Sequence, residues 1–433
     1  MSSRGPRSSS SPSRAVTAFT ELTNLCGAKT VSRTLQGAIF LILLAYYWWV
    51  WPSLSDFVTS IGGGDPLFKD FTHHYYPMAR SMFHQPLPVP GFFYSAFFGL
   101  LLAPFGLLPI NAAVWAWLVF QLVCFTLICA LPGSALLRLS PGQTILYRAL
   151  CATSLPVLHN FRWGQISVLI TVCVLASFSA YCAGKRLLSG VLLGLATAIK
   201  FYPILFLPYF ILKRDARMLA GFAAALIICY ALLPAAILGP GHWIAFEHAA
   251  LEAIAGADWI SQDLNSQYVV HVGLRLSDLA SRIGSVPVSS GMLRALGYGI
   301  VAVLFAAIWA LQKKAGRQEA SLSLTALWLT VPFLIRTSWP HYFVYLPFCQ
   351  IALLASLLPM LRDHRFRATS LGIPVLLSSF LSSSLAFNCF PQWGWYSMLG
   401  ILFFADALLI IPLCVIAFGE SRETHQSVPV ALS

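Results

Sequence analysis

The sequence predicts an all-α fold, a polytopic transmembrane helix bundle of about 12 spans. Of its 433 residues, 58% are hydrophobic and only 10% are charged, and the mean hydropathy is +0.76. A water-soluble domain carries far more charge than this. The apolar stretches are continuous rather than alternating, which favours helices over the strands of a transmembrane barrel.

Twelve stretches without charge, or nearly so, are candidate spans. A helix needs about 20 apolar residues to cross the hydrocarbon core, so most of them qualify, while 145–158 and 322–335 are short. The candidates are 35–51, 92–108, 110–131, 145–158, 166–184, 187–212, 218–238, 292–311, 322–335, 342–361, 370–387 and 396–418.

The basic residues suggest an orientation and a domain division. Residues before Leu35 include five Lys or Arg and one acid, and such an excess is typical of the cytoplasmic side. We therefore predict a disordered basic cytoplasmic tail at 1–34, a membrane domain at 35–418 and a cytoplasmic tail at 419–433.

The count of twelve leaves one conflict in the middle of the chain. It puts Arg138, Lys185 and Arg186 on the side opposite the other basic clusters. That conflict disappears if 92–108 and 187–212 are re-entrant hairpins. Pro104, Pro203 and Pro208 fit broken helices of this kind.

Two extracytoplasmic loops, about 52–91 and 239–291, are long enough to hold a site. Together they carry eight of the fifteen acidic residues. The stretch from His242 to Ile254 mixes aromatic and apolar residues with polar ones, which is typical of an interfacial helix. The alternative is that such a helix only caps the bundle.

The first outer loop is the densest polar segment. Within sixteen positions it holds Asp65, Lys69, Asp70, His73, His74, Tyr75, Tyr76 and Arg80. A carboxylate beside the bilayer can act as a general base on a sugar hydroxyl group. The alternative for Asp70 is a helix N-cap, because a helix could begin at Phe71. Adjacent histidines point to different faces of a helix, so we predict no metal site here.

Three other segments carry polar residues in or near apolar stretches. Lys200 interrupts 187–212, and a cation in that position could neutralise a phosphate group or could extend to the interface. Arg336 and His341 frame RTSWPHYF, on the same side as the Asp70 loop, and a phosphate partner is possible there as well. Arg162, Trp163, Gly164 and Gln165 form the third patch.

Composition also argues against other functions. The net charge of +12 is spread over juxtamembrane clusters without a nucleic-acid motif, so lipid headgroups explain it better. No D-x-D or E-x-D triplet occurs, which disfavours a nucleotide-sugar donor. The ten cysteines include no C-x-x-C pair and read as small buried hydrophobic residues. We predict no cofactor.

In order along the chain, these patches resemble glycosyltransferase family 87. The resemblance rests on DFTHHYY in the first outer loop, FFYSAFFGLLLAPFGLLP after it, WGQ at 163–165, AIKFYP around Lys200, NSQ at 265–267 and SWPHY at 338–342. It implies a GT-C fold that transfers a hexose, expected to be mannose, from a polyprenyl-phosphate donor to a lipid or glycan acceptor. The expected reaction is inverting and metal-independent, at the extracytoplasmic face of the cell's inner (plasma) membrane.

The resemblance also implies roles for individual residues. Asp70 would be the catalytic base, and Lys200 and His341 would stabilise the donor phosphate. Tyr75, Tyr76, Gln165, Asn265 and Arg336 are further candidates for substrate contacts. Two rival functions stay open at this point: a transporter or flippase of lipid-linked sugars, and a non-catalytic scaffold. A transporter would place its ionisable groups near the membrane midplane on repeated helices.

Overall fold

The structure is a computed structural model that describes residues 34, 36–61, 65–85, 87–132, 136–282, 287–313, 316–360, 365–390 and 392–419. This part of the chain contains helices and one isolated bridge between Ser154 and Ser383, but no strand. The predicted all-α class is confirmed for it. The predicted tails at 1–34 and 419–433 fall almost wholly outside the described residues.

Five helices of the described chain are long and apolar enough to cross a membrane. A helix at 36–50 and α2 (Leu54–Ser60) form a sixth span if the pair, bent by 75°, is counted as one. The predicted number of about twelve spans remains a prediction, because other apolar stretches form shorter helices. The five long helices are Ile110–Leu131, Ala216–Leu238, Ser290–Leu311, Pro340–Leu357 and Ile401–Phe418.

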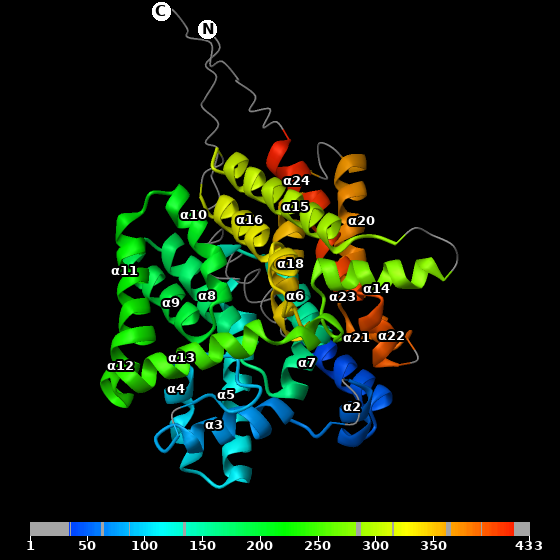
Figure 1. Ribbon diagram of the computed structural model, residues 1–433. Helices are drawn as coiled ribbons and strands as arrows, with labels where there is room; N and C mark the ends of the chain where they lie inside the picture. Colours follow the sequence, from blue (N-terminus) through cyan, green and yellow to red (C-terminus); the bar gives the residue numbers. More distant parts are fainter. Residues whose placement is uncertain are drawn as a thin grey trace, which may run out of the picture.

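One group of helices comes from the N-terminal half. Helix α8 is buried on nearly all sides, between α5 and α9, and α9 packs closely along α11 (Figure 1). The helices of this group are α5 (Ile110–Leu131), α6 (Pro141–Thr153), α7 (Leu155–Trp163), α8 (Ser167–Cys182), α9 (Arg186–Ile199), η3 (Tyr202–Phe206), α10 (Leu207–Leu212), α11 (Ala216–Leu226), η4 (Ile227–Leu232) and α12 (Leu233–Leu238).

Residues 186–215 form a hairpin rather than one span. Helix α9 ends at Lys200, and Pro203 and Pro208 begin new helical segments. The chain then returns, because the Arg186 guanidinium lies 3.3 Å from the Asp215 carboxylate. Lys200 therefore lies at the tip of this hairpin, and Arg186 shares one end of the molecule with the basic cluster at 213–217.

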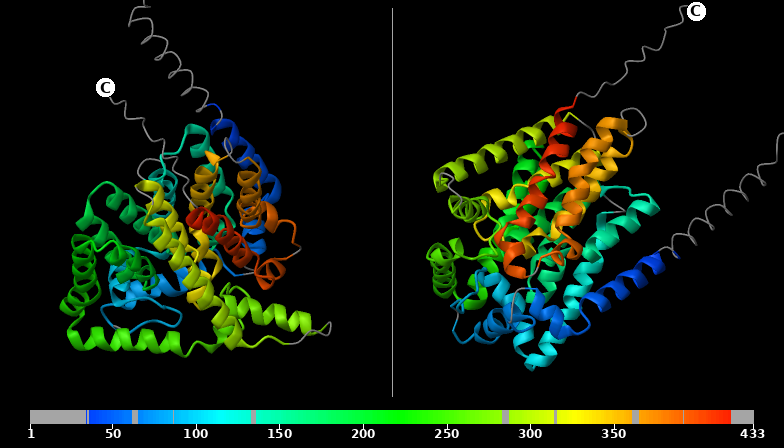
Figure 2. Two further views of the ribbon diagram at one scale, coloured as in Figure 1. Left: turned by 90° about the horizontal axis from the view of Figure 1, so that it is seen from above. Right: turned by 90° about the vertical axis from the view of Figure 1, so that its right-hand side faces the viewer.

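A second group of helices comes from the C-terminal half. Helices α20 and α24 pack side by side, and α15 packs against α24 (Figure 2). This group contains α15 (Ser290–Leu311), α16 (Arg317–Trp328), α17 (Val331–Leu334), η6 (Pro340–Tyr345), α18 (Leu346–Leu357), α20 (Arg365–Leu381), α21 (Ser384–Phe387), α22 (Trp393–Met398), α23 (Ile401–Ala407) and α24 (Ile410–Phe418).

The two predicted outer loops fold into short helices at one end of the bundle. Helix α13 runs nearly perpendicular to α11 and α12, as an interfacial helix would (Figure 1). The Glu247 carboxylate anchors it by accepting hydrogen bonds from the Ala96 amide and the Tyr230 hydroxyl, both at 2.8 Å. The helices of the two loops are α2 (Leu54–Ser60), η1 (Phe71–Tyr75), α3 (Tyr76–Ser81), α13 (Pro240–Ala255), η5 (Asp258–Ser261) and α14 (Val269–Ser281). Helix α4 (Ala96–Gly106) follows the first loop and forms part of the predicted span 92–108.

Candidate active site

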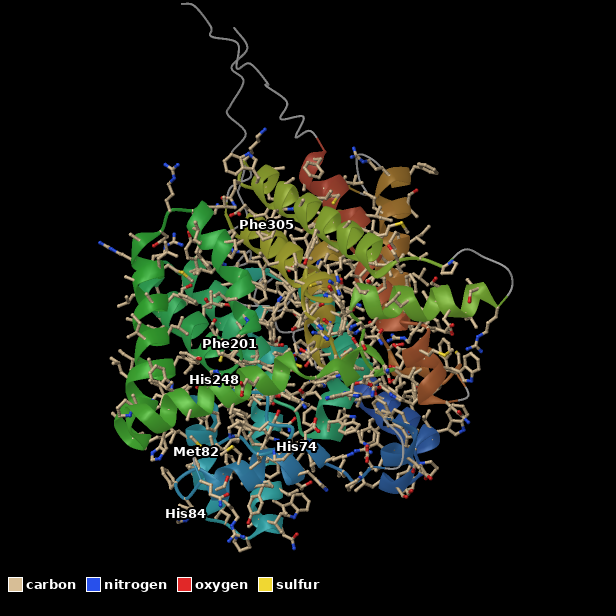
Figure 3. The ribbon with its side chains drawn as sticks, viewed as in Figure 1. His74, Met82, His84, Phe201, His248 and Phe305 are labelled. Carbon is tan, nitrogen blue, oxygen red and sulfur yellow. The ribbon has the colours of Figure 1, made fainter. Side chains whose placement is uncertain are left out.

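A cavity of about 670 Å³ lies between the outer loops and the bundle. Six segments that are separate in the sequence build its wall. The labelled side chains of His74 and Phe201, which both line it, lie in the central region near α13 (Figure 3). The lining residues used below are Asp70, His74, Tyr75, Tyr94, His159, Trp163, Gln165, Lys200, Phe201, Tyr202, Ile204, Leu205, Trp259, Asp263, Asn265, Trp339, His341 and Tyr342.

Asp70 lies in this wall, directly before the π-helix η1. Its side chain caps no helix, so the N-cap alternative is wrong; instead it accepts a hydrogen bond from Gln165 Nε2. His74 Nε2 lies 3.9 Å from the other carboxylate oxygen. Burial raises the pKa of Asp70, and Gln165, His74, Lys69 and Lys200 oppose that rise. A carboxyl group with a raised pKa is a stronger base once it is ionised.

Gln165 reaches Asp70 because of the turn that ends α7. Gly164 has a φ of +70°, which a residue with a Cβ seldom adopts. A Cβ at this position would also lie 3.0 Å from the Phe71 Cβ. The hydroxyl groups of Tyr75 and Tyr94 lie 3.0 Å from Gln165 Oε1, so its Nε2 is turned toward Asp70.

The first outer loop is held against α7 by a buried arginine. Arg162 is fully buried, and its guanidinium donates to the backbone carbonyls of Val58, Pro66 and Asp65. Its own carbonyl accepts from the Phe68 amide at 2.9 Å. Arginine suits this position because its planar fork presents several donors at fixed angles. These contacts fix the backbone that leads into Asp70.

Lys200 provides the buried positive charge of the cavity, whose lining also includes Lys69, the partner of Asp65. Its backbone is extended where α9 ends, and its side chain is 8% exposed. The ammonium nitrogen lies 4.0 Å from the centre of the Tyr342 ring and 5.0 Å from that of Tyr94. Among the described residues, no carboxylate lies within ion-pair distance of it. A buried cation that faces aromatic rings and a cavity is suited to an anionic ligand.

His341 lies on η6, opposite the tip of the hairpin. Its ring is 3% exposed, and neither nitrogen has a hydrogen-bond partner in the described part of the chain. The ring stacks on His159, with centroids 5.6 Å apart and planes 23° apart. Since buried polar atoms normally have partners, a ligand in the cavity is one way to supply them.

The other sequence candidates fall into two sets. Tyr75, Gln165 and Asn265 line the cavity with Asp70, Lys200 and His341. Tyr76 and Arg336 do not line it: the Tyr76 hydroxyl donates to the Leu108 carbonyl at 2.8 Å, and the Arg336 side chain is exposed. No local pattern separates Tyr76 and Arg336 from the residues that do line the cavity, because facing a cavity depends on tertiary packing.

The two adjacent histidines point apart. His74 lines the cavity, with Nδ1 2.8 Å from the Pro90 carbonyl oxygen, whereas the exposed His73 interacts with Thr72 and the Lys69 carbonyl. Within the described ranges, no three His, Cys, Asp or Glu side chains gather as metal ligands would. The cysteines described are all free thiols.

Several cavity residues escaped the sequence analysis. His159 stacks between His341 and the Trp393 ring, 5.1 Å away. Its one sequence signal is its position four residues before Trp163, on the same face of a helix. Trp259 and Asp263 belong to the second outer loop, where no local pattern marks them out. Their partner Trp339 belongs to the SWPHY segment.

Comparison with known protein families finds one matching family model. The sequence model of glycosyltransferase family 87 matches residues 92–337, a range that contains Gln165, Lys200 and Asn265 and excludes Asp70 and His341. No solved structure matches the chain.

Two relatives match over long stretches. A polyprenol-phosphate-mannose-dependent alpha-(1-2)-phosphatidylinositol mannoside mannosyltransferase of Mycobacterium tuberculosis is 28% identical over 61% of this chain. The match covers 62% of that relative, less than two thirds of its length. A polyprenol-phosphate-mannose-dependent alpha-(1-2)-phosphatidylinositol pentamannoside mannosyltransferase of Mycolicibacterium smegmatis is 28% identical over 78% of this chain and 80% of its own length.

Proposed function

Because the chain belongs to glycosyltransferase family 87, we propose that it transfers a hexose, mannose by analogy with its relatives, from a polyprenyl-phosphate donor to a lipid or glycan acceptor. The reaction would take place at the extracytoplasmic face of the cell's inner (plasma) membrane. The observation that carries the proposal is one cavity that gathers Asp70, Lys200 and His341 from distant parts of the chain.

Asp70 is the base of the proposed reaction. It accepts the proton of the acceptor hydroxyl as that oxygen attacks the anomeric carbon of the hexose. The bond between this carbon and the phosphate oxygen breaks, and the polyprenyl phosphate leaves with the electron pair. A single displacement from the opposite side inverts the anomeric centre.

Lys200 and His341 receive the departing phosphate. Lys200 supplies the positive charge, so the scheme requires no metal ion. His341 supplies a ring nitrogen that is unpartnered in the described part of the chain. Positive charge held in a buried site stabilises a developing phosphate anion more than water would, because the groups are already oriented.

The cavity has an apolar wall that suits a lipid donor. Phe201, Ile204 and Leu205 line it directly after Lys200. The side chains of Phe201 and Ile204 are 37% and 48% exposed, so this wall is continuous with the outer surface of the helices. A polyprenyl chain in the bilayer could lie along this wall while its phosphate reaches Lys200.

The test uses purified protein in liposomes with a polyprenyl-phosphate mannose donor and a mannosylated phosphatidylinositol acceptor. We expect a covalent hexosylated product from the wild-type protein and none from Asp70→Asn, because the amide cannot take the proton. Translocation of the donor without a new product would favour the rival flippase function.

Asp65→Asn is the matched control. Asp65 lies in the same loop, pairs with Lys69 at 2.7 Å and does not line the cavity. This variant should transfer hexose at close to the wild-type rate. If Asp70→Asn did so as well, Asp70 would not be the base.

A further inference from the structure

Two tryptophan rings form a platform at one side of the cavity. The Trp259 and Trp339 rings stack with centroids 6.4 Å apart and planes 19° apart. The Trp259 side chain is 53% exposed, although tryptophan normally buries its large apolar surface. Trp339 is held in place because its Nε1 donates to Asp263 Oδ2 at 2.7 Å.

Polar groups with free hydrogen-bonding capacity lie beside this platform. Asp263 Oδ1 accepts from the Asn265 backbone amide at 2.9 Å, so among the residues that the structure describes each carboxylate oxygen has one partner and can accept again. Asn265 Oδ1 accepts from Trp393 Nε1 at 2.7 Å. The Asn265 side-chain amide donates to no residue in the described part of the chain, and Asn265 lines the cavity.

A flat aromatic surface next to a fixed carboxylate and amide matches the chemistry of a sugar ring. One face of a pyranose or cyclitol presents C–H groups that pack on an aromatic ring, and its edge presents hydroxyl groups that donate and accept. A ligand without ring hydroxyls, such as a polyprenyl chain, would offer no hydrogen-bond partner to the side chains of Asp263 and Asn265.

We propose that Trp259, Trp339, Asp263 and Asn265 form the acceptor subsite, which binds a sugar or cyclitol ring of the acceptor headgroup. This inference rests on the proposed function and names the acceptor class as a polyhydroxylated ring. The Trp339 ring lies 5.9 Å from that of His341, so a headgroup on the platform lies beside the group assigned to the donor phosphate.

Direct binding tests the subsite without catalysis. The probes are methyl α-mannoside and myo-inositol, observed by saturation-transfer NMR with the protein in nanodiscs. The wild-type protein and Asp70→Asn should both saturate the protons on one face of the ring. Trp259→Ala should weaken this signal about fivefold. An equal signal from Trp259→Ala, or no signal from the wild-type protein, would overturn the subsite.

Kinetics provide the second test, with matched controls. Trp259→Ala and Asp263→Asn should each raise the acceptor KM about tenfold and leave the donor KM unchanged. Trp395→Ala and Asp278→Asn should change neither value, because both side chains lie outside the cavity lining, and Trp395 is 48% exposed. Equal increases in both KM values would show a general structural defect and contradict the subsite.

The two proposals can fail separately. If the wild-type protein binds the sugar probes through Trp259 but forms no hexosylated product, the subsite stands and the proposed function is wrong. If Trp259→Ala and Asp263→Asn transfer hexose with an unchanged acceptor KM, the function stands and the subsite is wrong.

Discussion

At the scale of single residues, the charge state of Asp70 decides whether the cavity can act on a hydroxyl group. Burial favours the protonated acid, and the hydrogen bond from Gln165 favours the carboxylate. A base works only when deprotonated, so the rate should rise with pH as Asp70 loses its proton. Gln165 therefore lowers the pH at which the proposed base becomes active.

Gln165→Leu removes the hydrogen bond to Asp70, so the pKa of Asp70 should rise further. The acidic limb of the kcat/KM profile should consequently move to higher pH, with activity partly regained in alkaline buffer. Gln350→Leu is the control, since that buried amide bonds Ser378 and Ser382 away from the cavity. A profile that falls equally at every pH would mean that Gln165 does not act through this pKa.

His159 contacts His341 by stacking rather than by hydrogen bonding, and we expect this contact to position the His341 ring. Both of its ring nitrogens are buried without a partner in the described part of the chain, while its faces contact His341 and Trp393. His159→Phe keeps a flat ring and removes two unsatisfied polar atoms, so thermal stability should not fall and transfer should persist.

His159→Ala leaves the His341 ring unsupported and should lower kcat more than KM. Rescue by phenylalanine distinguishes stacking from chemistry at a ring nitrogen. If His159→Phe were as inactive as His159→Ala, the nitrogens of His159 would contact the substrate and the stacking role would be wrong.

Some of these site residues could be predicted from the sequence and others could not, for a physical reason. Asp70 and Lys200 are conspicuous because a charge beside or within an apolar stretch is costly and marks a site. His159 and Trp259 act through ring faces that meet residues more than 75 positions away in the chain. No local pattern encodes such a contact.

At the scale of helices, close packing of α9 on α11 holds the hairpin that carries Lys200. Gly190 and Gly194 are four residues apart on α9, a spacing that lets helix backbones approach closely. A Cβ on Gly190 would lie 2.0 Å from the Met218 carbonyl oxygen and 2.6 Å from the Phe222 nitrogen. Both are backbone atoms, so a side chain there must separate the helices.

Gly190→Ala should therefore destabilise the protein by about 3 kcal/mol, the cost of overpacking a closely fitted contact. Thermal unfolding in detergent measures this change. Gly299→Ala is the matched control, because Gly299 lies within α15 with no atom within 4 Å of the added Cβ. That variant should be slightly more stable, by about 0.5–1 kcal/mol. Equal melting temperatures for the two variants would contradict close packing of α9 on α11.

Element boundaries show where prediction from sequence was limited. Helices Ile110–Leu131, Ala216–Leu238 and Ser290–Leu311 agree closely with the predicted spans 110–131, 218–238 and 292–311. The stretches 145–158 and 187–212 contain internal prolines and break into shorter pieces. Whether a broken stretch crosses the membrane or turns back depends on partners such as Asp215, which lie beyond the stretch itself.

At the scale of the whole molecule, the positions of the charged side chains distinguish the two ends of the bundle. The end opposite the outer loops holds the ion pairs Arg186–Asp215 and Lys213–Glu319, the second at 2.9 Å. The hairpin brings Arg186 to this end, which removes part of the conflict in the sequence-based orientation. An excess of Lys and Arg marks the cytoplasmic side, so the cavity end should face away from the cytoplasm.

Cysteine labelling in intact cells tests this orientation. His84 is exposed at the cavity end (Figure 3), and Arg217 is exposed at the opposite end, where α11 begins (Figure 1). Both cysteine variants are made in a parent protein in which serine replaces Cys389 and Cys26. Cys389 is an exposed thiol, and Cys26 lies outside the described residues. A membrane-impermeant maleimide should label His84→Cys in intact cells and Arg217→Cys only after the membrane is permeabilised. Labelling of both from outside would contradict the hairpin at 186–215, and the reverse order would place the cavity, and with it the proposed reaction, on the cytoplasmic face.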